Sequence, residues 1–304
     1  MSLKMSPNIL KIPCYILLAL LLICPVTALA YDIVDHQFKI ELAPNESRIR
    51  VSDSITVPEK LRGKTISFIL HGDLHIAASS VKVDQVDISV PFKSANQNYQ
   101  VPLKQYQLKL PPKQNQFNLQ YNGRINHPIT QPGEEYDRAM SETPGLIDSR
   151  GVFLADSSVW YPLMDDSLVT FSMTVTVPQN WSVVSQGKRT VHRQEKQKNH
   201  IGWEEHQPQD DIYIVANQYR EYSQAAGDVQ AMVFLRERDD ALAQKYLDTT
   251  GQYLGMYSRL LGPYLYAKFA LVENFWETGY GMPSFTLLGP KVLRFPFILH
   301  SSYP

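Results

Sequence analysis

Cysteine is scarce in this chain, which has two in 304 residues, Cys14 and Cys24. Both lie in the apolar N-terminal stretch, so the rest of the chain has no thiol that could form a disulfide or act as a nucleophile. The sequence also lacks a Gly-x-Ser-x-Gly elbow, a phosphate-binding glycine loop and a His-Glu-x-x-His zinc motif. These absences exclude a disulfide-stapled fold and the commonest hydrolase centres.

An excess of charge of one sign is also missing. Lys and Arg number 29, Asp and Glu number 30, and the formal net charge is −1. Because such a balance gives no electrostatic footprint for nucleic acid or for an anionic membrane surface, we expect neither as a partner.

The first thirty residues have the layout of a secretory leader. Lys4 and Lys11 precede an apolar run over residues 12–23, and the small-residue exit ends at Ala30. The pattern predicts a signal peptide over residues 1–30 that is cleaved after Ala30, which makes the mature protein secreted or periplasmic. The apolar run is too short to span a bilayer comfortably, so we expect no stable membrane anchor. Removing the leader takes away two lysines and no acid, which changes the formal charge from −1 to −3.

Residues 31–222 alternate between apolar and polar side chains in short runs bounded by Pro, Gly and Asn. The clearest runs are residues 38–42, 54–57 and 171–177. Many short alternating strands predict an antiparallel β-sandwich, in which one face of each sheet is buried. Two polar segments within it are expected to be a long surface loop, at 130–150, and a hairpin tip, at 189–211.

The pattern changes after Gly227. A strand at 229–235 is followed by a helix that Asp239 and Asp240 open, and by a further strand at 266–272. The apolar helix positions at a spacing near 3.6 are Leu242, Tyr246, Tyr253, Tyr257 and Leu260. We therefore place a domain boundary near Tyr222 and expect residues 223–304 to form an α+β segment.

Several short sequence motifs, taken in chain order, resemble those of one protein family. They are Tyr-Asn-Gly-Arg-Ile at 121–125, Trp-Tyr-Pro at 160–162, Thr-Val-Thr-Val-Pro at 174–178 with Ser-Gln-Gly at 185–187, and Gly-Met-Pro-Ser-Phe-Thr at 281–286. Together they resemble the N-terminal part of the aminopeptidase N-like zinc metallopeptidases, the gluzincins. The resemblance covers essentially the whole chain after the leader.

The resemblance implies a β-sandwich followed by the opening of a thermolysin-like catalytic domain. In the family, a Gly-x-Met-Glu-Asn edge strand aligns a peptide substrate, and a helix carrying His-Glu-x-x-His binds zinc about twenty residues later. Here Pro283 follows Met282 directly, so the Glu that binds the substrate's α-amine is missing. The zinc helix would begin about where Pro304 stands. We therefore expect a truncated chain that binds no zinc and is inactive by itself, zinc being the cofactor of the complete protein.

The resemblance assigns substrate binding to Gly281 and Met282, because glycine lets a second backbone approach closely. Tyr280 could line a substrate pocket, and Glu277 could replace the missing carboxylate. From the residues alone, the same stretch is a strand-to-turn connection in which Tyr280 packs and Glu277 is solvated.

Other histidines and acidic residues are candidate metal ligands or structural residues. His71, Asp73 and His75 lie within five residues and suggest a metal site, but Gly72 implies a turn, and a polar loop is the alternative. His300 is expected in the apolar tail as a partly buried residue and not as a zinc ligand. The acidic pairs are interpreted as turn and cap residues; they are Asp165 with Asp166, Asp210 with Asp211, and Asp239 with Asp240.

Three functions remain open from the sequence. The leading hypothesis is the N-terminal portion of a secreted zinc metallopeptidase that hydrolyses peptides in its complete form. The alternative is a non-catalytic secreted β-sandwich binding protein derived from that family, and a third possibility is a carbohydrate-binding sandwich. An uncovered apolar end at 292–298 would be an aggregation liability, and it favours a fragment over an evolved short form.

Overall fold

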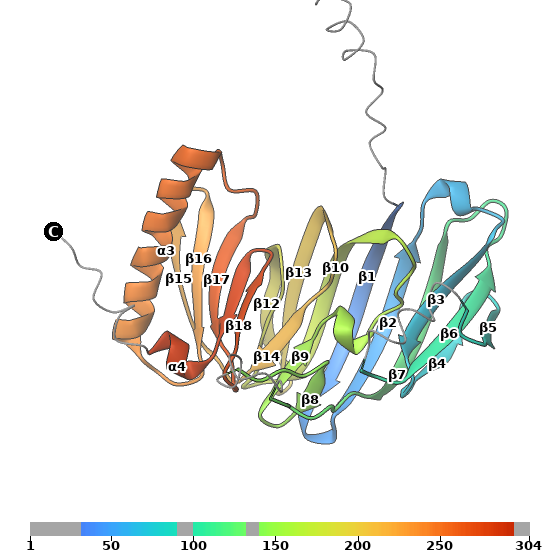
Figure 1. Cartoon of the computed structure of the whole chain (residues 1–304), viewed down its shortest axis with the longest axis horizontal. Coiled ribbons are helices and arrows are strands. Elements are labelled where there is room, and N and C mark those ends of the chain that lie inside the picture. Colours follow the sequence, from blue (N-terminus) through green and yellow to red (C-terminus); the bar gives the residue numbers. More distant parts are fainter. Residues whose placement is uncertain (1–31, 90–99, 132–139, 295–304) are drawn as a thin grey trace, which may run out of the picture. The chain divides into compact units, whose positions relative to one another are not determined.

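The computed structural model describes residues 32–89, 100–131 and 140–294, and the predicted fold class is confirmed. The fold is mainly β, with antiparallel sheets followed by a segment that contains a long helix (Figure 1). The predicted leader, His300 and most of the apolar end at 292–298 lie outside the described residues.

The largest sheet has seven strands in the order β12-β13-β10-β1-β2-β7-β4. In β1, alternate side chains from Val34 to Leu42 are buried, which is the period of a sheet with one covered face. β1 pairs in parallel with β10, and every other neighbouring pair is antiparallel. The strands are β1 (Asp32–Ala43), β2 (Arg48–Thr56), β4 (Leu74–Ser79), β7 (Gln116–Arg124), β10 (Ser167–Pro178), β12 (Lys188–Glu195) and β13 (Lys198–Gln209).

Two smaller sheets, ordered β3-β6-β5 and β11-β14-β9-β8, accompany it. Their strands are β3 (Thr65–His71), β5 (Val83–Val86), β6 (Leu103–Lys109), β8 (Leu146–Asp148), β9 (Gly151–Leu154), β11 (Ser182–Val184) and β14 (Ile214–Asn217). The expected surface loop at 130–150 is partly wrong, because β8 lies in it and buries Leu146 and Ile147. The segment at 189–211, expected as a hairpin tip, is instead the body of the hairpin of β12 and β13, whose tip is confined to residues 196–197.

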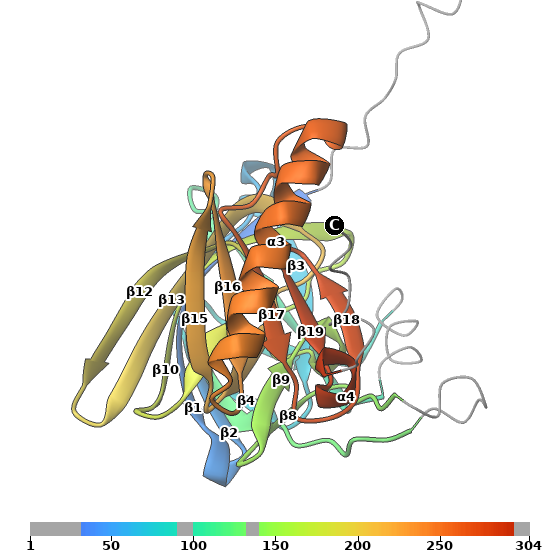
Figure 2. The same cartoon turned by 90° about the vertical axis from the view of Figure 1, so that its left-hand side faces the viewer.

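The last sheet has the order β15-β16-β17-β19-β18. Its strands are β15 (Arg220–Ala226), β16 (Val229–Leu235), β17 (Lys268–Glu273), β18 (Gly279–Met282) and β19 (Phe285–Leu288). Helix α3 (Asp240–Leu261) packs on β15 and β16, and the short α4 (Pro290–Leu293) follows β19 (Figure 2). As predicted, Asp239 caps α3, because its side chain accepts the N–H of Leu242 at 2.9 Å.

The second half of α3 differs from the prediction. Leu242 and Tyr246 are buried as expected, but Tyr253, Tyr257 and Leu260 are 51%, 52% and 71% exposed. A helix of 22 residues is about 33 Å long, whereas the seven-residue strands beneath it extend about 23 Å. The helix therefore runs beyond the sheet that covers its apolar face.

Buried side chains on both sides of the predicted boundary near Tyr222 belong to one contiguous cluster, which includes Phe153, Tyr219, Phe234 and Phe285. The boundary falls inside β15, and the division into two domains stays a prediction. Within the described ranges, no helix is both long and apolar enough to cross a membrane.

Candidate groove beside the edge strand

A groove of about 610 Å³ lies beside β18, the last strand of its sheet. One side is formed by three consecutive residues of β18. The other sides come from the N-terminal part of the chain, including the 3₁₀ turn at Asp156–Ser158. The described lining residues are Gln100, Thr130, Gln131, Glu142, Thr143, Pro144, Phe153, Ser157, Tyr213, Tyr280, Gly281 and Met282.

The edge of β18 faces this groove. Successive side chains of a strand point to opposite faces, so a groove that touches Tyr280, Gly281 and Met282 in turn runs along the strand's backbone. A Cβ added to Gly281 would meet no atom within 4 Å. The face of β18 is therefore open at Gly281, and the free edge of this last strand could pair with a second backbone as an additional strand.

The structure brings three of the four predicted site residues to the groove. Tyr280 is half-buried, its ring stacks on Phe153 with centroids 5.9 Å apart, and burial raises the pKa of its phenol. Glu277 does not line the groove. Its two carboxylate oxygens lie 3.3 Å from the backbone N–H of Lys291, at the start of α4. The functional roles of these residues stay predictions.

The segment that follows Met140 is tied to the start of β18. The indole of Trp276 donates to the carbonyl of Ser141 at 2.9 Å, and the N–H of Ser141 donates to the carbonyl of Glu277 at 2.9 Å. These contacts join residues about 135 positions apart, so the groove wall depends on the packing of distant segments.

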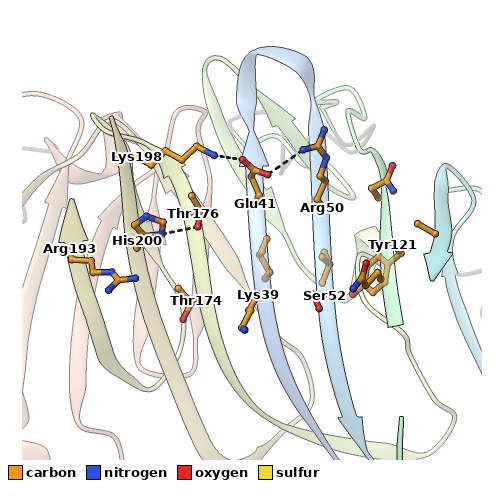
Figure 3. A pocket seen from close by; sticks show the side chains of 15 residues that line it. Lys39, Glu41, Arg50, Ser52, Tyr121, Thr174, Thr176, Arg193, Lys198 and His200 are labelled. Carbon is orange, nitrogen blue, oxygen red and sulfur yellow. Dashed lines mark hydrogen bonds and ion pairs between the residues drawn. The ribbon is translucent and has the colours of Figure 1, made fainter. Parts of the chain in front are cut away.

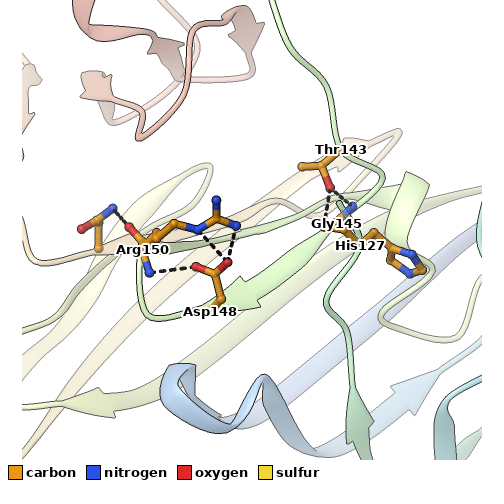
Figure 4. A network of polar contacts seen from close by, with 6 residues as sticks. His127, Thr143, Gly145, Asp148 and Arg150 are labelled. Atoms are coloured by element: carbon orange, nitrogen blue, oxygen red, sulfur yellow. Dashed lines mark hydrogen bonds and ion pairs between the residues drawn. The ribbon is translucent and has the colours of Figure 1, made fainter. Parts of the chain in front are cut away.

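Polar contacts hold the remainder of this wall (Figure 4). The N–H of His127 donates to the carbonyl of Gly145 at 3.0 Å, and the N–H of Gly145 donates to the hydroxyl of Thr143 at 3.3 Å. Further along, the guanidinium of Arg150 donates twice to Asp148, at 3.0 and 2.6 Å. Of these contacts, the one from Gly145 holds the side chain of Thr143, which lines the groove.

The groove has one charged lining residue, and a buried carboxyl group lies close to its lining. Glu142 is the one charged side chain among its described lining residues. Behind it, Asp211 is buried and accepts the N–H groups of Asp156 and Ile212 at 2.8 and 2.5 Å. Burial, and then the charge of Asp156, raise the pKa of Asp211 to about 8. The interpretation of Asp211 as a turn or cap residue is met in part, because its buried side chain accepts the first N–H of the 3₁₀ turn at Asp156–Ser158.

The suggested metal site at the β3–β4 turn does not assemble. His71 accepts the N–H of Asp73 through Nδ1 at 3.0 Å, so its Nε2 carries the proton of the neutral ring and faces Nε2 of His127 at 2.8 Å. His75 instead lies 3.4 Å from the ammonium of Lys104. In the part of the chain that the structure describes, no group of three or more His, Cys, Asp or Glu could hold a metal ion. These residues do not fit the zinc that the resemblance implies.

Sequence reasoning missed a buried lysine of β17 that contacts the turn after β18. The Lys268 ammonium lies 2.7 Å from the hydroxyl of Ser284 and 5.0 Å from the ring centroid of Trp203. Ser284 follows β18 with a positive φ of 66°, and its hydroxyl also accepts the N–H of Gly187 at 3.0 Å. Burial lowers the pKa of Lys268 well below its ordinary value. The one sequence signal is a lysine within an otherwise apolar strand.

No family model and no curated protein matches this chain. Solved structures are similar to it at the level of the fold. An M1 zinc metallopeptidase mutant from Deinococcus radiodurans, bound to a Tyr-Ser-Ala substrate, is 12% identical with a TM-score of 0.59, over 88% of this chain and 62% of that chain. A second M1 zinc metallopeptidase structure from the same organism is 12% identical with a TM-score of 0.55, over 85% and 59%.

A mutant two-domain M1 zinc metallopeptidase bound to L-arginine is similar to the same degree. It is 12% identical with a TM-score of 0.57, over 85% of this chain and 60% of that chain. The present chain thus spans about three fifths of the length of these structures. At 12% identity the likeness concerns the fold.

Proposed function

We propose that this chain is the N-terminal portion of a secreted, aminopeptidase N-like zinc metallopeptidase, and that β18 is the strand on which an extended peptide aligns. The fold likeness to M1 zinc metallopeptidases supports the peptidase origin. The leader at residues 1–30 supports secretion. The observation that carries the proposal is the edge of β18 along the groove, with open space at Gly281.

The groove supplies binding and alignment. An extended peptide would add a strand to β18, and the half-buried Tyr280 and Met282 would contact its side chains. Pro283 has no N–H, so the pairing would end at Met282. In the complete protein, the zinc ion would supply the activated water. We assign no hydrolytic step to the described residues, since they hold neither a ligand set nor a base placed for that water.

The test uses the full chain and a C-terminally labelled Tyr-Ser-Ala peptide, with binding followed by fluorescence anisotropy. Gly281→Val adds a branched side chain on the face of β18 beside the position of the paired peptide, and its Cβ would meet no atom of the protein within 4 Å. We expect the affinity to fall by at least about tenfold, with Gly281→Ala intermediate. Gly255→Ala on α3, at a second glycine with open surroundings, is the matched control and should leave binding unchanged.

Two results would contradict the proposal. One is wild-type binding that Gly281→Val does not weaken, because the ligand would then lie elsewhere. The other concerns catalysis: we expect no turnover when the chain is mixed with zinc and peptide. Turnover that a chelator abolishes would show that the chain does hold a metal centre.

A further inference from the structure

A second groove crosses the outward face of the seven-stranded sheet (Figure 3). Its volume is about 690 Å³, and it shares no lining residue with the groove beside β18. Every strand of the sheet contributes, from Arg193 on β12 to Ala77 on β4. Six inter-strand spacings make it about 28 Å long, so it fits an elongated occupant.

Positive charge is concentrated on this face although the whole chain has a formal net charge of −1. Lys39, Arg50, Arg193 and Lys198 line the groove, against a single acid, Glu41. Glu41 contacts both Lys198 and Arg50, and these cations lower the pKa of its carboxyl. The ammonium of Lys39 and the guanidinium of Arg193 have no hydrogen-bond or ion-pair partner among the described residues. Two cations are therefore left for an anionic ligand.

The rest of the lining is neutral and hydrogen-bonding. Hydroxyl and amide side chains occupy the outward positions between the cations; they are Ser52, Gln120, Asn122, Thr174 and Thr176. A further hollow of about 510 Å³ on the same face continues this composition with Ser54, Asn118 and Ser172. Tyr121 touches the groove, but its side chain is 1% exposed and packs in the core.

We propose that this face binds an anionic polysaccharide, a chain of sugar rings that carries sulfate or carboxylate groups. Lys39 and Arg193 would pair with the anionic groups, and the hydroxyl and amide side chains would exchange hydrogen bonds with sugar hydroxyls. This inference does not depend on the proposed peptidase origin.

Other polymers fit the face less well. A peptide could not pair with it as a strand, because the backbone groups of a sheet face already bond to neighbouring strands. Apart from Ala77, the lining also lacks an apolar side chain that could form a pocket for a peptide anchor. Single-stranded nucleic acid is usually held by aromatic stacking, and no exposed aromatic side chain lies in this groove.

The test is a titration of the full chain with a heparin hexasaccharide, which is sulfated, and with a hyaluronan hexasaccharide, which carries carboxylates alone. The double variant Lys39→Ser, Arg193→Ser removes the two unpaired cations from an exposed sheet face. Its control, Lys64→Ser with Lys113→Ser, removes the same charge from exposed positions outside the groove. We expect the groove variant to lose affinity by about tenfold or more, and the salt dependence of binding to become shallower.

The two sugars distinguish the sources of the anion. Heparin binding alone indicates sulfate recognition, and binding of both indicates that a carboxylate suffices; either supports the proposal when the groove variant weakens it. The absence of binding to both sugars would overturn the proposal, as would equal weakening by the control variant. A uridine dodecamer that binds more tightly than either sugar, and that the Lys39→Ser, Arg193→Ser variant binds more weakly, would also overturn the proposal.

Discussion

At the scale of single residues, the pair formed by His71 and His127 makes stability depend on pH. Burial, and then the neighbouring His127, lower the pKa of His71 from 6.5 to about 4. The unfolded chain therefore binds more protons than the folded one between these values. The free energy of unfolding therefore has its full value above about pH 6.5. It decreases by about 1–3 kcal/mol as the pH falls towards 4.

His71→Asn tests this prediction, because asparagine can still accept the N–H of Asp73 and does not titrate. Urea unfolding of the full chain between pH 7 and 4.5 should show a shallower loss of stability in this variant than in the wild type. His75→Asn, at an exposed position of β4, is the control variant. Equal slopes for all three proteins would show that another group causes the acid sensitivity.

At the scale of elements, the turn between β18 and β19 is anchored by Lys268 and Ser284. Ser284→Ala removes the hydroxyl that accepts the N–H of Gly187 and the ammonium of Lys268, and the ammonium keeps only the carbonyl of Ser284 at 3.2 Å. We expect it to lower the free energy of unfolding by about 1–3 kcal/mol. Lys268→Met leaves neither polar group of Ser284 without a partner. The hydroxyl of Ser284 still accepts the N–H of Gly187, and its carbonyl still accepts the N–H of Ala270.

Lys268→Met should therefore be neutral or stabilising, because replacing a buried charge by an apolar side chain of similar length removes its desolvation cost. Urea denaturation of both variants at pH 7 checks the order. A Lys268→Met variant that is less stable than Ser284→Ala would mean that the ammonium itself, and not the hydroxyl of Ser284, holds the turn.

The elements show which features the sequence could predict. Alternation along β1 and β10 and the cap at Asp239 depend on local chemistry, and they were predicted correctly. The resemblance directed attention to Gly281, and the structure places that residue on a groove. The wall opposite it could not be predicted, because Ser141 meets Trp276 only after distant segments have packed. The same holds for His127, which faces His71 from 56 positions away.

At the scale of the whole molecule, the contiguous core joins the predicted sandwich to the segment that follows it. Phe153 of β9 packs edge-on against Trp276, with ring centroids 5.5 Å apart, and stacks on Tyr280 of β18. Lys268 of β17 lies over the ring of Trp203 in β13. Separating the two parts would expose these aromatic rings to water, at a cost that neither part could recover by itself.

We therefore expect the described part of the chain to unfold in one cooperative transition, despite the predicted boundary near Tyr222. Near-ultraviolet circular dichroism and tryptophan fluorescence should give coincident urea midpoints, because Trp160 and Trp203 lie before that boundary and Trp276 after it. Hydrogen exchange followed by mass spectrometry should show that β10 and β16 lose protection together at the urea midpoint. Earlier opening of β16, with β10 still protected, would show that the C-terminal segment is a separate unit and that the shared aromatic contacts are too weak to couple the two.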